Sequence, residues 1–305
     1  MGGAPQSSSS IPRMPVRVMA ILNVTPDSFS DGGHLRNRNT VLRAALEAIN
    51  AGADILDIGG ESTRPGAQEI SVDEELSRVI APLVWIRDEF PDISLSIDSR
   101  KSRVVAEALS LGVHIVNDVS GLQFDPNMLA VVADSKASLI LMHSHGVPET
   151  MQQEPDKAEV YRHGILAAVH QFFTEAIAKT NEAGIAGNRL ILDPGFGFGK
   201  SVAHQLTLLK HLDTFRYPCE AASSITEGSH MIPLLVGTSR KSFMALTAAG
   251  EGVKAKDILP PGERDFLTAA SMALAIERGA ALVRVHNAKA MVPIVRFVER
   301  CIVDF

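Results

Sequence analysis

Residues 17–22 read RVMAIL, an apolar run with the length of a buried strand. A polar loop follows, and then VLRAALEAINAGA at 41–53, in which apolar residues recur three and four positions apart, as on one face of a helix. A second apolar run, DILDI at 54–58, comes directly after this helical pattern. A strand, a helix and a second strand in this order predict a βαβ unit with two parallel strands.

The same unit recurs along the whole chain. The predicted strands are residues 17–22, 54–58, 93–97, 114–117, 138–142, 189–193, 233–237 and 281–285. Continuous apolar strands that alternate with helices predict a parallel sheet covered on both faces. Eight units fit a single α/β domain, a closed (β/α)8 TIM barrel, better than the alternative of an open, doubly wound sheet. We expect the barrel to occupy residues 16–305 and residues 1–15 to form a flexible lead-in.

Composition narrows the classes of function. The 305-residue chain has a formal net charge of −6, which disfavours nucleic acid as a partner because phosphate neutralisation requires a basic surface. Cys219 and Cys301 have no zinc-binding or redox spacing and suit a reducing compartment. No apolar run has the length of a membrane span, and residues 1–15 lack the apolar core of a secretory signal. We expect a cytoplasmic protein without a membrane segment, or a mitochondrial one if a transit peptide has been removed.

Polar side chains or glycine-rich turns follow each predicted strand. They are Asn23, GGESTRPG at 59–66, Asp98, Asn117, His143, Asp193, GTSRKS at 237–242 and His286. The carboxyl ends of barrel strands share one rim, where sites are built, so we expect these groups around one mouth. Any one of them alone is compatible with a turn residue or a helix N-cap. Together, Asp98, Asn117 and Asp193 suit a planar heterocycle that is rich in N–H groups.

A second set of residues is basic and follows the last two predicted strands. Lys241 lies in SRKS at 239–242, and Arg284 and His286 lie in RVHN at 284–287. The loops after the seventh and eighth strands of such barrels frequently bind phosphate, so these side chains predict a site for phosphate or diphosphate. Arg284 lies inside the apolar run ALVRV and needs a partner, either this anion or a neighbouring carboxylate.

Three glycine-rich loops complete the predicted mouth. DPGFGFGKS at 193–201 matches neither a Walker loop nor the dinucleotide fingerprint. It is expected to bring backbone and an aromatic ring, Phe196 or Phe198, close to a ligand. NVTPDSFSDGG at 23–33 and GGESTRPG at 59–66 combine glycine with proline, a composition typical of loops that order over a substrate.

Eight blocks of the sequence resemble, in the same order, the signature blocks of the dihydropteroate synthases. They are MAILNVTPDSFSDGG, DILDIGGESTRPGA, SIDSRK, IVNDVSG, LMHSHGVPETMQ, LDPGFGFGK, GTSRKSF and RVHN, from about residue 17 to 290. The resemblance implies a pterin-binding (β/α)8 barrel, a transferase of folate biosynthesis that uses Mg²⁺. Such an enzyme condenses 6-hydroxymethyl-7,8-dihydropterin diphosphate with 4-aminobenzoate to give 7,8-dihydropteroate and diphosphate. The resemblance also implies a homodimer and a target of sulfonamides.

The resemblance implies roles for individual residues. Asn23 would ligate Mg²⁺ together with the diphosphate. The pterin diphosphate would be held by Thr63, Asp98, Asn117, Met142, Asp193, Lys241, Arg284 and His286, with Asp193, Lys241, Arg284 and His286 acting in catalysis. The pocket for 4-aminobenzoate, where sulfonamides also bind, would consist of Phe29, Arg64, Pro65, Phe198 and Ser242. Met142 would form an apolar wall beneath the bound ring.

Three features depart from the family's pattern. The segment 215–233 is longer than most connections, Phe266 and Leu267 stand where a glycine is more frequent, and Asn287 stands where Asp is common. The long segment resembles a fungal insertion, and the abrupt start is compatible with the synthase domain of a fused folate-synthesis protein.

Two other interpretations stay open at this point. One is a methyltetrahydrofolate methyltransferase that works with a corrinoid partner, which would have no use for the basic set at 239–242 and 284–286. The other is a non-catalytic pterin-binding relative. None of the expected site positions is lost from the sequence, which disfavours that second alternative.

Overall fold

The computed structural model describes residues 15–25, 38–62, 66–146, 151, 159–219, 231–250, 252–253 and 257–302. All but residue 15 of the expected lead-in at 1–15 lies outside these ranges, as do residues 220–230 of the long segment at 215–233. The domain prediction for the lead-in therefore stays a prediction.

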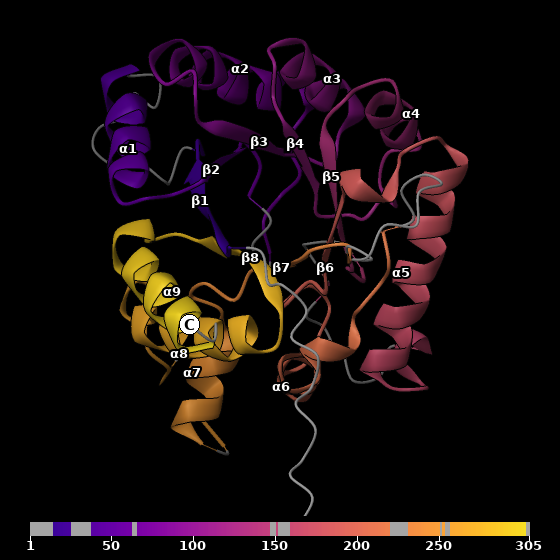
Figure 1. Ribbon diagram of the computed structural model, residues 1–305, viewed down its shortest axis with the longest axis vertical. Helices are drawn as coiled ribbons and strands as arrows, with labels where there is room; N and C mark the ends of the chain where they lie inside the picture. Colours follow the sequence, from indigo (N-terminus) through magenta and orange to yellow (C-terminus); the bar gives the residue numbers. More distant parts are fainter. Residues whose placement is uncertain are drawn as a thin grey trace, which may run out of the picture.

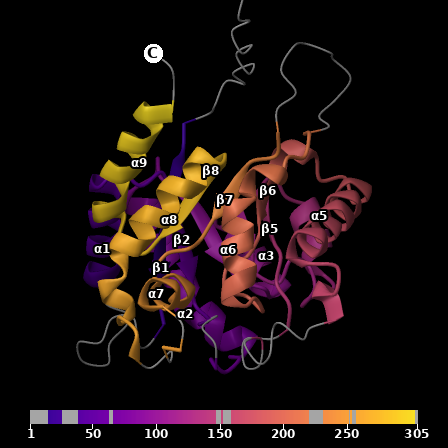
Figure 2. The same ribbon diagram turned by 90° about the horizontal axis from the view of Figure 1, so that it is seen from below.

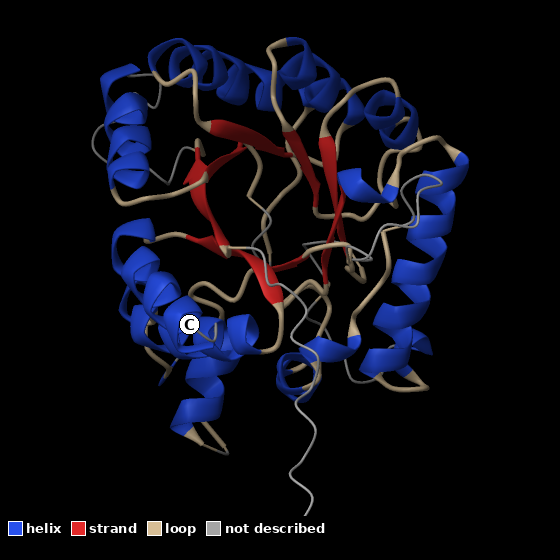
Figure 3. Ribbon diagram, viewed as in Figure 1, coloured by secondary structure: helices blue, strands red, loops and turns tan. Residues whose placement is uncertain are grey.

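Parallel strands close into a barrel in which β1 pairs with both β2 and β8. The strands are β1 (Arg17–Asn23), β2 (Ile55–Gly59), β3 (Ser94–Asp98), β4 (Ile115–Asp118), β5 (Ser138–Met142), β6 (Leu190–Asp193), β7 (Leu234–Val236) and β8 (Ala280–Val285). Figure 3 shows them as a ring inside a shell of helices. Each strand end lies within one residue of its predicted position. The predicted closed barrel is confirmed, and the open, doubly wound sheet is wrong.

Helices cover the outer face of the barrel (Figures 1 and 2). They are α1 (Arg38–Asn50), α2 (Val72–Glu89), α3 (Ser102–Ser110), α4 (Met128–Ala133), α5 (Ile165–Glu182), α6 (Val202–Lys210), α7 (Ser242–Ala249), α8 (Asp265–Glu277) and α9 (Ala288–Ile302). Short 3₁₀ helices lie in the connections at η3 (Glu159–Tyr161), η4 (Gly187–Arg189), η5 (Leu212–Thr214) and η7 (Pro261–Glu263). No helix within the described ranges is both long and apolar enough to cross a membrane.

Local sequence signals set where two of the helices begin. Ser71 Oγ accepts a hydrogen bond from Glu74 N at 3.1 Å. Acidic residues fill the first turn of α2, where their negative charges interact favourably with the positive end of the helix dipole. Ser201 caps α6 in the same way, because its Oγ accepts from His204 N at 3.2 Å. Both caps end a loop that comes from the carboxyl end of a strand, so they fix the length of that loop.

The alternation of side chains along the strands gives the barrel interior an apolar layer and a polar layer. Met19, Ile55, Ile115, Ile140, Ile191, Leu235 and Leu282 pack together inside the barrel. Side chains two residues apart point to the same face of a strand, so the residues two positions further along also face inward. In β2, β4, β6 and β8 these are Asp57, Asn117, Asp193 and Arg284. The fold therefore places polar groups directly above the apolar core, at the carboxyl ends of the strands.

Candidate active site

Arg284, on β8, is the centre of the polar layer. Its Nε donates to Asp57 Oδ2 at 2.6 Å and its Nη2 donates to Asp98 Oδ2 at 2.5 Å, so one guanidinium bridges β2 and β3. Asn117, on β4, donates from Nδ2 to the same Asp57 oxygen at 3.1 Å. The structure thus brings together three predicted residues, Asp98, Asn117 and Arg284. Of the two partners considered for Arg284, the structure shows the neighbouring carboxylates.

Asp57 is a site residue that the sequence prediction did not include. Its side chain is fully buried, and its Oδ1 has no hydrogen-bond partner within the described part of the chain. A signal was available, because a carboxylate in the apolar run DILDI and an arginine in ALVRV both need a partner. Buried charges are tolerated when they are paired, and Arg284 compensates the charge of Asp57 through Oδ2.

Electrostatics in this cluster bring the pKa of one carboxyl group, that of Asp98, close to neutral pH. Burial raises the pKa of Asp98 to about 7; the charge of Arg284 opposes the shift and the charge of Asp57 adds to it. Burial disfavours the charge of Arg284, but the carboxylates of Asp57 and Asp98 prevail and raise the pKa of its guanidinium. Arg284 therefore stays charged, while Asp98 changes its charge within the working pH range of most enzymes.

Asp193, at the end of β6, and Lys241, the N-cap of α7, form another part of the mouth. Asp193 Oδ1 accepts from Gly195 N at 2.7 Å. Burial raises the pKa of Asp193 to about 6, although this hydrogen bond and the charge of Lys241 lower it. Burial lowers the pKa of Lys241 to about 8, and the charge of Asp193 opposes that shift. The two groups thus carry opposite charges between these two values.

One aromatic ring of the loop 193–201 lines the site. The Nζ of Lys241 lies 4.3 Å from the ring centroid of Phe198, a cation–π distance. Phe196 is buried instead, with its ring stacked on that of Phe243 at 6.0 Å. Phe198, and not Phe196, therefore lies beside Lys241, and Ser242, the first residue of α7, follows Lys241 in the chain.

Lys200 holds this loop in place and was also absent from the predicted set. Its side chain is 1% exposed, and its Nζ donates to the carbonyl oxygens of His143, Gly195 and Phe198 at 2.9, 2.8 and 3.1 Å. These three acceptors use all three N–H donors of the ammonium group. Gly195 has φ 69°, and a Cβ there would lie 1.9 Å from the His143 carbonyl oxygen. The ammonium and the glycine together keep the loop against the end of β5.

Two further predicted residues lie at strand ends. His286, after β8, is exposed, and its Nδ1 hydrogen-bonds with Ser239 Oγ at 2.9 Å, which links β8 to the turn after β7. Asn23 ends β1 beside Gly59, where an added Cβ would lie 3.2 Å from Asn23 Oδ1 and 3.4 Å from Asp98 Cβ. A side chain at position 59 would therefore press on both residues, so Gly59 lies close to the carboxamide of Asn23 and the carboxylate of Asp98.

The remaining predicted positions have different outcomes. Met142 is buried at the end of β5 and pairs in register with Asp193 of β6, and its role as an apolar wall stays a prediction. His143, expected at the rim, packs its ring against the rings of Tyr161 and Phe172 and so does not join the site. Phe29, Thr63, Arg64 and Pro65 lie outside the described residues, and their roles stay predictions.

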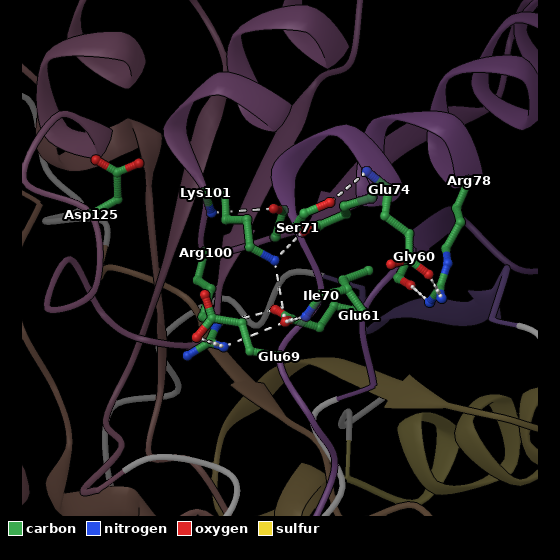
Figure 4. Close-up of polar contacts among 12 residues, drawn as sticks. Gly60, Glu61, Glu69, Ile70, Ser71, Glu74, Arg78, Arg100, Lys101 and Asp125 are labelled. Carbon is green, nitrogen blue, oxygen red and sulfur yellow. Dashed lines mark hydrogen bonds and ion pairs between the residues drawn. The ribbon is translucent and has the colours of Figure 1, made fainter.

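A buried ion network lies beside the mouth, between the segment after β2 and the turn after β3 (Figure 4). Arg100 Nε donates to Glu61 Oε2 at 3.1 Å, and Lys101 Nζ donates to Glu75 Oε2 at 2.6 Å. Lys101 Nζ also lies 3.2 Å from Glu61 Oε1. All four side chains are buried, and Arg100 Nη2 also lies 3.4 Å from Oε2 of the half-exposed Glu69. Removing either cation would therefore leave carboxylate charge in the interior without full compensation.

The same network anchors the ends of the segment after β2. Ile70 N donates to Glu61 Oε1 at 3.2 Å, and Arg78 Nη1 donates to Gly60 O at 2.8 Å (Figure 4). Since Arg100 and Lys101 closely follow Asp98 in the chain, the network also ties this segment to the cluster around Arg284.

Known proteins match this chain over most of its length. The sequence profile of the family described as "Pterin binding enzyme" matches residues 19–286. The dihydropteroate synthase of Escherichia coli (strain K12) is 42% identical over 283 residues, which are 92% of this chain and 90% of the relative. This chain belongs to the dihydropteroate synthases. It is therefore a transferase of folate biosynthesis.

Solved structures of dihydropteroate synthases share the fold. The Yersinia pestis enzyme, in a sulfonamide drug complex, has a TM-score of 0.79 at 39% identity and covers 94% of each chain. The Burkholderia cenocepacia enzyme, complexed with 7,8-dihydropteroate, has a TM-score of 0.76 at 37% identity, over 94% of this chain and 91% of its own. The predicted dihydropteroate synthase family and its TIM barrel are confirmed.

Proposed function

We propose that the residues at the barrel mouth carry out the dihydropteroate synthase reaction, which joins a pterin methylene to the amine of 4-aminobenzoate and releases diphosphate. The main support is that one polar layer combines two carboxylates and an amide with the cations Lys241 and Arg284. The carboxylates and the amide can hydrogen-bond a planar pterin. The two cations can bind a diphosphate leaving group.

The pterin ring would bind within the polar layer. The carboxylates of Asp98 and Asp193 would accept hydrogen bonds from its amino and ring N–H groups, and the amide of Asn117 would complete this edge. Met142, beside Asp193 in the sheet register, offers a polarisable thioether to the face of the ring. Thr63 keeps its proposed place in the same set.

Lys241, Arg284 and His286 would hold the diphosphate. As the C–O bond to the diphosphate breaks, its electron pair leaves with the oxygen, and the cations stabilise the negative charge that develops. The positive charge that appears on the pterin methylene would be stabilised by the carboxylate of Asp193. The reaction would thus separate charge in a mouth that already carries both complementary charges, Arg284 beside Asp98 and Lys241 beside Asp193.

The amine of 4-aminobenzoate would then attack the methylene carbon, form the C–N bond and lose a proton. Phe198 and Ser242 adjoin Lys241 and would contribute the described part of its pocket. Phe29, Arg64 and Pro65 would contribute the rest. A flat aromatic carboxylate suits a pocket with an aromatic wall and cations, and sulfonamides would compete for it.

Asn23 fits a Mg²⁺ site that the substrate completes. Its amide oxygen is a hard donor at the end of β1, close to Asp98. Within the described ranges no group of three or more His, Cys, Asp or Glu residues could hold a metal ion. Mg²⁺ commonly uses one or two protein ligands together with substrate phosphates and water, so such a group is not required. Bound there, Mg²⁺ would neutralise charge on the diphosphate.

The assay that tests this function follows diphosphate release from 6-hydroxymethyl-7,8-dihydropterin diphosphate. Release is expected only when 4-aminobenzoate and Mg²⁺ are both present, with one 7,8-dihydropteroate formed for each diphosphate. Chromatography measures the amount of 7,8-dihydropteroate formed. Tight binding of the pterin without release would contradict the catalytic proposal and favour a protein that only binds pterin.

The substitution Arg284→Ala is expected to lower the single-turnover rate by roughly 10²–10³-fold, because a preorganised charge on the leaving group is lost. It also leaves Asp57 and Asp98 without their cation, so circular dichroism must first show a native fold. Arg284→Lys, which keeps a charge but not the planar fork, is the matched variant and should retain more of the rate. A near-normal rate for Arg284→Ala would remove the proposed role.

The activity is expected to rise with pH on the acid side and to fall with pH on the alkaline side. The carboxyls of Asp98 and Asp193 have pKa values raised to about 7 and about 6, and they must be deprotonated to accept from the pterin as carboxylates. Lys241 has a pKa lowered to about 8 and must be protonated to hold the anion. The value of kcat/KM for the pterin diphosphate should therefore rise up to about pH 7 and fall above about pH 8. Lys241→Arg, whose side chain stays protonated, should lose the alkaline limb, and an unchanged limb would exclude Lys241 as its source.

A homodimer is proposed through α6 and α8, which contact each other on the outside of the barrel. Phe266 and Leu274 on α8 are 62% and 42% exposed, although the opposite side of this helix packs into the core. Leu206 on α6 is 40% exposed. A helix that is apolar on all sides usually packs on more than one side, so a second subunit would cover this face.

Light scattering is expected to give a mass of about twice the 32.7 kDa of the chain. Phe266→Ser should shift the protein towards the monomer, because it places a hydroxyl group in the proposed interface. Leu46→Ser is the control, since Leu46 is 43% exposed on α1, away from α6 and α8. Equal masses for the two variants would contradict this interface.

A further inference from the structure

Arg240, in the turn after β7, has an unusual backbone conformation. Its φ is 60°, and among the described residues Leu122 is the other non-glycine residue with a positive φ. The left-handed region is unfavourable for a non-glycine residue, and it persists where the surroundings enforce it. Arg240 lies between Ser239, the partner of His286, and Lys241, so the strain occurs inside the proposed diphosphate site.

The residues at the start of α8 hold Arg240 in this conformation. Its Nε and Nη2 donate to the two carboxylate oxygens of Asp265 at 2.8 and 3.1 Å, a bidentate ion pair. Its backbone N–H donates to Thr268 Oγ1 at 3.0 Å, and its carbonyl accepts from Arg264 Nη1 at 2.9 Å. The side chain and both backbone groups of the strained residue are therefore bound to one helix terminus.

Asn287, which directly follows His286, also hydrogen-bonds to Asp265. Its Nδ2 donates to Asp265 Oδ2 at 2.7 Å, and its Oδ1 accepts from Ala290 N at 3.1 Å, which caps α9. Hydrogen bonds from Arg240 and then from Asn287 lower the pKa of Asp265, although burial opposes the shift. The carboxylate is thus kept charged by two residues, and one of them directly follows His286.

We propose that Asp265, supported by Asn287, is a positioning residue that keeps Arg240 in its left-handed conformation and thereby directs Lys241 and His286 at the diphosphate. This inference rests on the proposed function of that site. An aspartate at position 287 would also cap α9, but it would face Asp265 with a second negative charge in place of an N–H donor. The asparagine at this position therefore fits a network whose single carboxylate comes from α8.

The test measures, by calorimetry on the whole chain with Mg²⁺, the Kd of 6-hydroxymethyl-7,8-dihydropterin with and without its diphosphate. Asp265→Asn is expected to raise the Kd of the diphosphate form about tenfold, the size expected for loss of a charge-assisted pair. The Kd of the form without diphosphate should change less, whereas general damage to the site would weaken both. Asp73→Asn is the matched control, because Asp73 also lies in the first turn of a helix and pairs with an arginine, Arg103, at an exposed position.

A double-mutant cycle with Arg240→Gly separates positioning from a direct effect of Asp265. Glycine adopts a positive φ without strain and has no side chain for Asp265 to hold. On that background Asp265→Asn should change the Kd less than about twofold. The same factor in both backgrounds, or a wild-type Kd for Asp265→Asn itself, would overturn the inference.

A second variant keeps the test valid if Asp265→Asn does not fold. Asn287→Asp retains the cap of α9 and is expected to raise the Kd of the diphosphate form several-fold, because like charges oppose each other beside Arg240. An unchanged Kd would count against the network. A wild-type protein that binds no pterin diphosphate would remove the proposed function and this inference together, whereas loss confined to the expected variants supports both.

Discussion

The guanidinium of Arg284 lies inside a barrel and is mostly withdrawn from solvent, and such a charge requires partners at close range. Desolvating an ion costs several kcal/mol, and here two carboxylates, one of them bonded to Asn117, offset that cost. These partners belong to β2 and β3, with β1 between them and β8. The ion pairs are therefore compatible with only one register of the four strands. Closing the barrel and assembling the polar layer are consequences of the same constraint.

Other charged groups stabilise the mouth in a similar way. The network of Glu61, Glu75, Arg100 and Lys101 anchors the segment after β2. The ammonium of Lys200 fixes the loop after β6 through three carbonyl oxygens. Apolar packing forms the barrel below, whereas buried charges define the loops above it. Such interactions depend strongly on geometry, which suits a site that must hold its groups at fixed distances before substrate arrives.

Much of the fold and part of the site follow from the sequence alone. Each βαβ unit has its own hydrophobic pattern, so the strands could be predicted within one residue. Asp98, Asn117 and Asp193 could be predicted because each polar residue directly ends an apolar run. Arg284 is recognisable as a charge in a strand that needs a partner, but the identity of the carboxylates that pair with it required the structure.

The residues that the sequence did not reveal depend on tertiary contacts. Asp57 is 227 positions from Arg284 in the chain, and only the register across β8, β1 and β2 makes them neighbours. Lys200 binds backbone carbonyls, which every residue has, so no sequence pattern marks its partners. Asp265 acts on a turn whose left-handed φ at an arginine no propensity would predict.

The close contact at Gly195 has a consequence for how this enzyme can change during evolution. Any side chain at that position would collide with the carbonyl oxygen of His143, a backbone atom that cannot shift without moving the chain after β5. Lys200 is equally constrained, because another side chain could not donate to the same three carbonyl oxygens from the same place. Substitution at either position therefore requires the end of β5 to move, so these two residues are expected to change less readily than the rest of the mouth.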